Sequence, residues 1–464
     1  MVSTDRVAPS SFDDKSPKVG VLSDGTPAVI WGKGSTIYFS KMEGSEFTAP
    51  VTINTNGITP DIYSFGGIDL ATSGDKVFIV YEDFNTGVHF VRSDDAGQTF
   101  ELPVSVFDPP AGLWATLPSV GADDMGNPLV SVIRETTSET QGRYIFMRSD
   151  DGGLTFTMPS VASEPADGEY VCECCPSDIF SKGNDVFLVF RNNNNNLRDM
   201  WVSHSTDGGL NFTEATDVDD TDWVISACPI SGPKMAALAG DSLITAWKSG
   251  ASNSNRVSFS TLNSTTMEKG WEFQFPQTNT NSGQDAPDIA GSNDTIGIVW
   301  QETGFGVNST DLMFAFSKTG ASGLVNNFAN ITAATGVQRN PSLVYDNGFF
   351  HLVYSDASGG VLYQKGTVSE INSTVSVSEN KLSLNIISQP IIGQEIIVQN
   401  NGELINDAAF ILSNIAGQKI KEIKYTTIYL GEKITFNTGD IAAGIYLLQA
   451  FSKNKYWSEK IIVQ

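Results

Sequence analysis

Four cysteines are the residues of this chain whose type and spacing most directly suggest chemistry. Cys172, Cys174 and Cys175 lie in the segment YVCECCP, and Cys228 lies in DWVISACPISGP. An even number of cysteines in an exported protein favours disulfides, and four cysteines allow three pairings. We expect all four to be close together and oxidised, with Cys172 bonded to Cys228 in one of these pairings and Cys174 to Cys175. The alternative is a copper or zinc site, because soft thiolates suit these metals, although Cys-x-Cys-Cys differs from the usual zinc spacing.

A second group of polar and aromatic residues could bind or process a ligand. Arginine suits carboxylates because its planar fork bonds both oxygens. The ligand-binding candidates are Arg134, Arg191, Arg198, Arg339 and Trp223, with Trp114 and Trp201 as further stacking platforms. The catalytic candidates, which could transfer protons, are Glu135, Asp199 and Tyr170, with Glu82 and Glu302 as further acids. The alternative interpretation of each arginine is an ion pair that joins neighbouring parts of the fold.

One phrase of the sequence occurs three times at a constant spacing. RSDDAGQTFE, RSDDGGLTFT and HSTDGGLNFT share Ser-x-Asp-x-Gly-x-Thr/Asn-Phe, and their serines are 56 residues apart. A fixed period of this size is typical of solenoids and propellers. Glycine with Asp or Asn between two apolar runs is typical of hairpin turns. The aspartates of these turns, to which we assign a structural role, are Asp95, Asp151 and Asp207.

A longer repeat contains these turns. A strand, a polar turn and a more apolar strand occur seven times, beginning near Pro17 and ending with the copy at Pro341, at intervals of 50 to 58 residues. Four antiparallel strands repeated radially make a β-propeller. The sequence therefore predicts an all-β protein with a seven-bladed propeller over residues 1–370, or a six-bladed one as the alternative. The last copy lacks an obvious fourth strand, so an N-terminal segment is expected to complete it.

The repeated phrase resembles the Asp-box, or BNR repeat, of the sialidase superfamily. That resemblance implies a propeller in which each box connects the third and fourth strands of a blade, on the face opposite the ligand site. Sialidases also use three arginines, a Tyr nucleophile with a Glu partner, an Asp acid/base and an Arg-Ile-Pro motif. This chain has no Arg-Ile-Pro, which puts true sialidase activity in doubt.

Alternating strand direction sorts the candidate residues between the two faces. Second-to-third turns and the connections between blades lie on the face without Asp-boxes, which we call the boxless face. The candidate arginines and acids, Trp223 and all four cysteines fall on that face. We therefore expect the functional site where blades three, four and five meet on the boxless face.

The C-terminal part of the chain differs from the rest in charge and in sequence motifs. Residues 379–464 carry eight lysines and eight acidic residues, so the propeller carries the whole net charge of −25. The segments NIAGQK, AGIYL and KIIVQ resemble the type A sorting domain of the type IX secretion system. This resemblance implies a Bacteroidota protein with a small Ig-like β-sandwich over residues 379–464, joined by a Ser/Thr-rich linker at 371–378. It also implies a secreted protein or one at the outer-membrane surface, with the secretion machinery as a partner.

Composition excludes several other functions. A chain this acidic is not expected to bind nucleic acid, because phosphate contacts need Lys and Arg, and no apolar stretch is long enough to predict a transmembrane segment. No cofactor is firmly predicted, apart from copper or zinc at the cysteines. We expect recognition or processing of an extracellular glycan or another anionic ligand, by a binding module, a sialidase-like hydrolase or a polysaccharide lyase. The alternative is a metal or redox protein built on the cysteine cluster.

Overall fold

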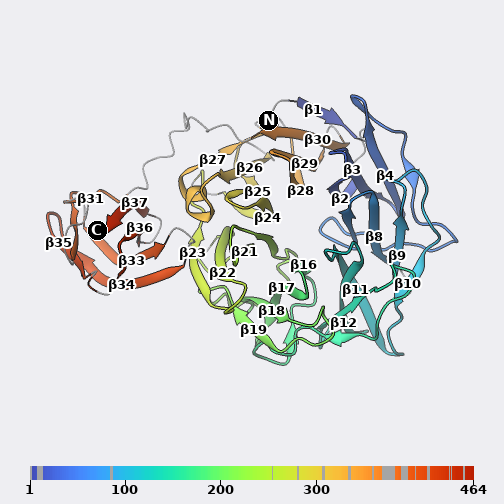
Figure 1. The fold of residues 1–464 in the computed structure, drawn as a ribbon, viewed down its shortest axis with the longest axis horizontal. Helices are drawn as coiled ribbons and strands as arrows, with labels where there is room; N and C mark the ends of the chain where they lie inside the picture. The colour runs from blue at the N-terminus through green and yellow to red at the C-terminus, as the bar shows by residue number, and fades with distance from the viewer. Residues whose placement is uncertain are drawn as a thin grey trace.

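The computed structural model describes residues 3–7, 14–83, 87–252, 254–279, 282–305, 309–332, 336–357, 360–367, 382–387, 395–402, 404–414, 418–437, 439, 441–452 and 455–463. These residues form seven antiparallel sheets arranged in a ring, and a smaller two-sheet unit beside the ring (Figure 1). We number the sheets as blades one to seven in chain order. The propeller architecture predicted from the repeats is thus present.

The first four blades have the following strands. Blade one contains β2 (Asp14–Val21), β3 (Pro27–Lys33), β4 (Thr36–Glu43), β5 (Glu46–Phe47) and β6 (Val51–Thr52); blade two contains β7 (Ile68–Ser73), β8 (Lys76–Glu82), β9 (Val88–Ser93) and β10 (Val104–Phe107); blade three contains β11 (Leu113–Ala122), β12 (Pro128–Thr136), β13 (Arg143–Arg148) and β14 (Ser160–Val161); blade four contains β15 (Tyr170–Val171), β16 (Asp178–Lys182), β17 (Asp185–Asn193), β18 (Met200–Ser205) and β19 (Glu214–Asp217).

The other three blades complete the ring. Blade five contains β20 (Lys234–Ala237), β21 (Ser242–Ser249), β22 (Arg256–Asn263) and β23 (Lys269–Gln274); blade six contains β24 (Gln284–Ser292), β25 (Thr295–Thr303), β26 (Thr310–Ser317) and β27 (Phe328–Asn330), with the 3-10 helix η1 (Ala321–Asn326) before β27; blade seven contains β28 (Gln338–Asp346), β29 (Phe349–Asp356), β30 (Gly360–Thr367) and β1 (Ser3–Arg6). The strand β1 pairs with β30, in the register Arg6↔Leu362. The N-terminal segment therefore closes the last blade, as the missing fourth strand predicted.

Each second strand is a continuous apolar run because its two faces pack against different neighbouring blades. In β8, Phe78 and Val80 belong to the buried cluster shared with blade three, whereas Ile79 and Tyr81 belong to the cluster shared with blade one. Side chains alternate between the two faces of a strand, and a strand packed on both faces loses the polar alternation of a half-exposed one. This arrangement explains why the seven apolar runs were the strongest signal in the sequence.

Hydrogen bonds between first strands join the blades around the axis. A carboxylate oxygen of Asp69 accepts the N–H of Val120 at 3.0 Å, and one of Asp288 accepts the N–H of Leu343 at 2.8 Å. Asp178 accepts the N–H of Met235 at 2.9 Å in the same way. These aspartates lie on β7, β24 and β16, so each satisfies a backbone donor of the next blade that sheet pairing leaves free.

The three Asp-containing turns share one hydrogen-bonding pattern. Oδ1 of Asp95 accepts the N–H groups of Gln98 and Thr99 at 3.0 and 2.8 Å, and Oδ2 accepts the Thr99 hydroxyl at 2.6 Å. Asp151 accepts the corresponding bonds within its own turn. Bonds from Thr99, followed by those from the turn backbone and Ser93, lower the pKa of Asp95 to about 2. The turns connect the third and fourth strands of blades two, three and four.

The same turns join each of these blades to the preceding one. Phe156, at the end of the second turn, packs edge-on against Phe90 of blade two, with ring centroids 5.2 Å apart. Gly153 has a φ of 93°, and a Cβ there would lie 2.3 Å from the Phe90 ring. Arg92, the first residue of the preceding phrase, donates to the carbonyl of Gly152 at 2.7 Å. The repeated phrase therefore contains the turn of its own blade, and its first residue, the arginine, bonds to the turn of the following blade.

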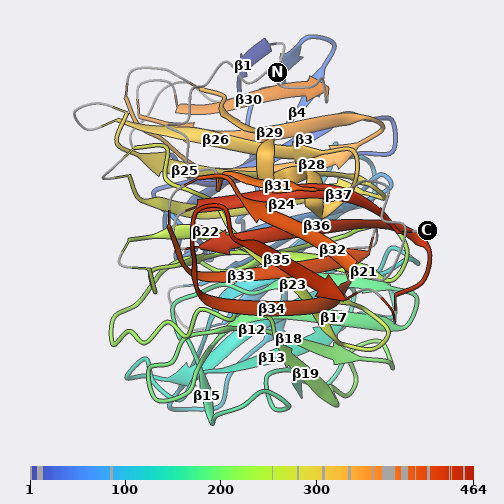
Figure 2. The same ribbon diagram turned by 90° about the vertical axis from the view of Figure 1, so that its left-hand side faces the viewer.

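The C-terminal unit has its own core. Its two sheets consist of β31 (Leu384–Ile386), β32 (Glu395–Asn400) and β35 (Lys433–Asn437), and of β33 (Ile405–Asn414), β34 (Lys419–Ile428), β36 (Gly444–Ser452) and β37 (Lys455–Val463). Their buried residues form a single cluster that includes Phe410 and Leu448. The unit lies against blades five and six (Figure 2), where Phe451 and Phe273 have ring centroids 6.0 Å apart. The predicted linker at 371–378 lies outside the described residues.

Candidate functional site

The central channel itself offers little room for a ligand. The first strands lie around the channel, and its mouth on the boxless face contains a cavity of about 60 Å³ lined by residues such as Phe65, Pro176 and Ile230. This volume holds about two water molecules. Lys234 also lines this cavity, 3.3 Å from Asp178. Burial lowers the pKa of Lys234, but the charges of Asp178 and Asp69 outweigh burial and raise it. A ligand much larger than a few water molecules would have to lie outside this cavity.

Glu135 is the predicted acid with the most unusual environment. It lies near the boxless end of β12, has an exposed fraction of 3%, and its Oε2 has no hydrogen-bond partner among the described residues. Burial, followed by the charges of Glu173, Glu139 and Glu82, raises the pKa of Glu135 to about 8. A carboxyl group in this environment keeps its proton at neutral pH, which is the state a general acid requires.

Two arginines lie at the same end of blade three as Glu135, on the other face of its sheet. Arg134 on β12 and Arg143 on β13 are directly opposite each other in the sheet register, and both side chains are partly exposed. Arg143 lies over the ring of Tyr170, with its guanidinium carbon 5.7 Å from the ring centroid. Within the described parts of the chain, no carboxylate forms an ion pair with either arginine. Two adjacent cations without an acidic partner are unusual in so acidic a chain and could bind an anion.

Tyr170 contributes from blade four. It begins the two-residue strand β15, which pairs with the end of β17 and brings Val171 within hydrogen-bond distance of the Gly142 carbonyl, at 3.0 Å. A hydrogen bond to Glu169 and then burial raise the pKa of Tyr170. The structure therefore places Tyr170 against Arg143 where blades three and four meet. Arg134 lies across the strand pair from Arg143, and Glu135 projects from the other face of β12.

A second carboxyl group lies on the other side of blade three. Glu82, at the end of β8, accepts the hydroxyl of Thr116 at 2.8 Å and the N–H of Leu117. Burial raises the pKa of Glu82 to about 7, although these hydrogen bonds lower it. Tyr63, in the connection between blades one and two, donates to Asp61 at 2.9 Å. Burial and then the charge of Glu82 raise the pKa of Tyr63, so its hydroxyl remains protonated.

Other predicted residues are held by structural contacts. Arg191 is fully buried and donates to the carbonyls of Arg198 and Lys248 at 2.9 and 2.6 Å. Its guanidinium carbon lies 5.2 Å from the ring of Trp223, which is 8% exposed. In this structure Arg191 and Trp223 support the junction of blades four and five, and a ligand on the rim does not reach Arg191. The sequence predicted exposed arginines at this junction. In the structure Arg191 is buried instead.

Asp199, Glu302 and Arg339 lie apart from Glu135. Asp199 accepts the N–H of Trp223 at 3.3 Å, and burial, then the charges of Asp219 and Asp217, raise the pKa of Asp199 to about 7. Glu302 is fully buried and accepts hydrogen bonds from Thr278, Gln284 and Trp300. This environment indicates a structural role for Glu302. Arg339 is exposed on β28 in blade seven.

The cysteines are close together, but they pair differently from the prediction. The disulfide joins Cys174 to Cys228, with Cα atoms 6.1 Å apart, whereas Cys172 and Cys175 are free and buried. The N–H of Cys172 donates to the Arg191 carbonyl at 3.0 Å, immediately after β15, which holds Cys172 in the interior. The predicted pairing of Cys172 with Cys228, and the expectation that all four are oxidised, are therefore wrong in this structure.

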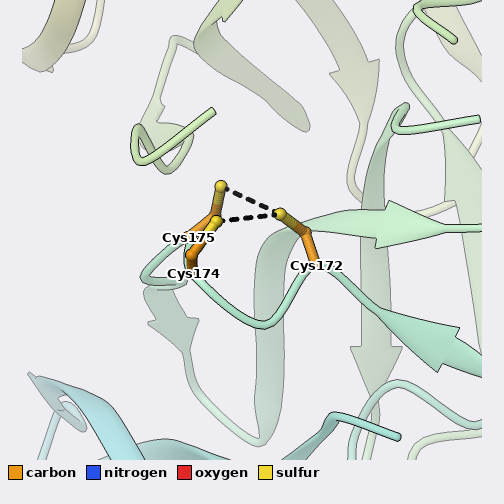
Figure 3. Close-up of side chains that lie close together, drawn as sticks. All are labelled: Cys172, Cys174 and Cys175. Atoms are coloured by element: carbon orange, nitrogen blue, oxygen red, sulfur yellow. Dashed lines mark hydrogen bonds between the residues drawn. The ribbon is translucent and has the colours of Figure 1, made fainter. Parts of the chain in front are cut away.

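The sulfur atoms nevertheless form one cluster. Sγ of Cys172 lies 3.6 Å from that of Cys174 and 3.2 Å from that of Cys175 (Figure 3). The ligand atoms of Cys172, Cys174 and Cys175 lie within 4.8 Å of one another, close enough for one soft metal ion. With Cys174 in a disulfide, only two thiolates remain as ligands.

Two parts of this region were not predicted from the sequence. Arg143 follows a polar turn and carries no motif, and only its register opposite Arg134 connects it with the site. Tyr63 and Asp61 lie in an irregular connection, so strand periodicity gave no indication of their position. A count of arginines near the boxless ends of third strands could have found Arg143.

Comparison with known proteins identifies the C-terminal unit. Residues 390–464 match the family model of a secretion system C-terminal sorting domain. The protein is secreted or at the cell surface. Among the described residues, no helix is long and apolar enough to cross a membrane. A comparison with curated proteins found no significant match.

Three solved structures illustrate the similarity in fold. The chain is 12% identical to a protein of unknown function from Dyadobacter fermentans, over 79% of this chain and 98% of that one, with a TM-score of 0.46. It is 10% identical to an α-L-arabinanase of Penicillium chrysogenum complexed with arabinobiose, over 79% and 98% of the chains, with a TM-score of 0.45. It is 10% identical to the NanB sialidase of Streptococcus pneumoniae, over 64% and 67%, with a TM-score of 0.43.

Proposed function

We propose that this secreted propeller binds and processes an acidic extracellular glycan on the boxless face, where blades three and four meet. One observation carries the proposal: Arg134 and Arg143 lie side by side without an acidic partner among the described residues, and Glu135, the residue after Arg134, has a raised pKa at the same end of blade three. Two guanidinium groups suit a carboxylate or sulfate, and a buried protonated acid suits transfer of a proton to a departing glycosidic oxygen.

Each residue has a distinct role in this proposal. Arg134 and Arg143 hold the anionic group, and Tyr170, whose ring lies under Arg143, fixes the direction of that guanidinium. Glu135 donates the proton, and because its Oε2, which has no partner in the described structure, is buried, the proposal requires neighbouring side chains to move aside when the glycan binds. Glu82 is the candidate for a second carboxyl group, because hydrolysis of a glycosidic bond needs a base or nucleophile besides the acid.

The alternative role as a binding module differs from this proposal at Glu135. A binding module needs the arginines but no proton donor, so Glu135→Gln would leave it intact. An enzyme loses turnover in the same variant while it keeps its affinity, because only the transition state uses the proton.

A panel of polysaccharides tests the proposal. Polygalacturonate, chondroitin sulfate and a sialylated oligosaccharide represent acidic glycans, and arabinan and starch represent neutral ones. Binding is measured by calorimetry, and turnover by new reducing ends and by absorbance of unsaturated products. We expect binding to one or more acidic glycans, and the double variant Arg134→Ala/Arg143→Ala should weaken it by about tenfold or more.

Lys182→Ala is the matched control. The side chain of Lys182 is 63% exposed and lies on the face that carries the Asp-boxes. This variant should leave glycan binding unchanged. The proposal fails if no acidic glycan binds, if neutral glycans bind equally well, or if Lys182→Ala weakens binding as much as the double variant does.

A further inference from the structure

An accessible disulfide lies directly above two buried thiols at the junction of blades four and five. Cys228 is exposed and Cys174 is partly exposed, whereas Cys172 and Cys175 are fully buried. The exposed sulfur lies in the connection between β19 and β20, which also carries the exposed side chains of Val224 and Ile230. A disulfide that served stability alone would need no thiols behind it.

The buried thiols are placed to react with that disulfide. Figure 3 shows Cys172 facing both Cys174 and Cys175, with sulfur separations of 3.6 and 3.2 Å. A thiolate attacks a disulfide sulfur along a line that begins near van der Waals contact, and the attacked sulfur exchanges its partner. Cys172 is therefore in contact with the sulfur it would attack, and Cys175 is in contact with Cys172.

A positively charged side chain lies against the attacking sulfur. Nη1 of Arg198 lies 2.9 Å from Sγ of Cys172, and its Nε donates to the Ile225 carbonyl at 3.1 Å, which holds the guanidinium in place. Burial and the hydrogen bond with Cys175 raise the pKa of Cys172, and the charges of Arg191 and Arg198 oppose that shift. A position beside arginine is typical of cysteines that react.

We propose that these four cysteines form a thiol–disulfide exchange site, in which Cys172 attacks Cys174 and releases Cys228 as the thiolate that meets external partners. In this step the Cys172–Cys174 bond forms and the Cys174–Cys228 bond breaks. Cys172 attacks as the thiolate, and its negative charge moves to Cys228. No oxidant or reductant is consumed, because one disulfide replaces another.

The released Cys228 can then react with a second molecule. Its thiolate attacks the disulfide of a small extracellular compound, a Cys228 mixed disulfide forms, and the other half of the compound leaves as a thiolate. The exposed Val224 and Ile230 offer an apolar surface beside this sulfur. The partner class is therefore a disulfide compound with an apolar portion, and the reaction is independent of the glycan site.

Native alkylation of the full-length protein tests this step. N-ethylmaleimide is added without reductant, and peptide mapping by mass spectrometry then locates the modified cysteines and the remaining disulfide. We expect modification of Cys228 together with a Cys172–Cys174 disulfide. In Cys172→Ser the attacking sulfur is missing, so modification of Cys228 should slow by about tenfold or more.

The wild-type map alone can decide the question if the variant folds poorly. Local unfolding would expose both free thiols, so it would place the label on Cys172 and Cys175 while the Cys174–Cys228 bond stays intact. That outcome overturns the proposal, and so does the absence of any label on Cys228. Stoichiometric zinc or copper in the purified protein, with four cysteines that alkylate only after the metal is removed, also overturns it in favour of a metal site.

Discussion

Replacement of Glu135 by glutamine is expected to make the propeller less sensitive to alkaline pH. The folded environment raises the pKa of Glu135 from 4.5 to about 8, through burial and then through neighbouring acids. The folded state therefore holds a proton that the unfolded state releases above pH 4.5. This contribution to stability is fully present below that pH and is lost as the pH rises towards 8.

The size of the effect follows from the shift. A shift of three to four units corresponds to at most about 4–5 kcal/mol. Solvent screening near the exposed Glu139 reduces this figure, so we expect a net effect of about 1–2 kcal/mol. Glutamine keeps the shape of the side chain but cannot ionise, so it removes this contribution to the pH dependence.

Urea unfolding at pH 5 and pH 8 measures the effect. Wild type should lose about 1–2 kcal/mol more unfolding free energy between these pH values than Glu135→Gln loses. Glu82 and Asp199 also have raised pKa values, each about 7, but both proteins share them and the comparison cancels them. Equal losses in the two proteins would refute the assigned environment of Glu135.

Three further predictions concern the architecture. Gly153→Ala should destabilise the propeller by about 1–3 kcal/mol, because the added Cβ would meet Phe90 at 2.3 Å; Gly183→Ala, which meets no atom within 4 Å, should cost less in the same urea titration, and the reverse order would contradict the packing. Cys228→Ser should cost about 2–4 kcal/mol by opening a disulfide that spans 54 residues, and unchanged urea midpoints would argue against that bond. Deletion of residues 379–464 should leave a folded propeller, judged by circular dichroism, that stays inside the cell; normal export would contradict the sorting role of the tail.

The architecture could be predicted because it repeats. A sequence phrase that recurs every 56 residues encodes the same turn three times. The packing of Phe156 against Phe90 explains why the phenylalanine that ends the phrase also recurs. The missing fourth strand of the last copy indicated closure by the N-terminus, which β1 provides. Repetition of this kind averages out the local ambiguity that limits the prediction of single strands.

The site could be predicted only in part, because its contacts do not repeat. Strand direction placed Arg134, Glu135 and Tyr170 on the boxless face, and they lie at that end of blades three and four. Strand direction does not predict that Arg191 points inward and donates to two carbonyls, because an arginine at a strand end can point either way. The choice of Cys174 over Cys172 for the disulfide depends on the two-residue strand β15, which is too short to be recognised from sequence.

The most direct test concerns the proton on Glu135. Full-length protein with 13C-labelled glutamate side chains is titrated by NMR between pH 4 and pH 10 (roughly the range that spans ordinary and raised carboxyl values), and comparison with Glu135→Gln assigns the signal. The site described here predicts a titration near pH 8, so that the group is protonated and able to donate at neutral pH. A titration near the ordinary value of 4.5 would contradict it and would remove the acid on which the proposed glycan chemistry depends.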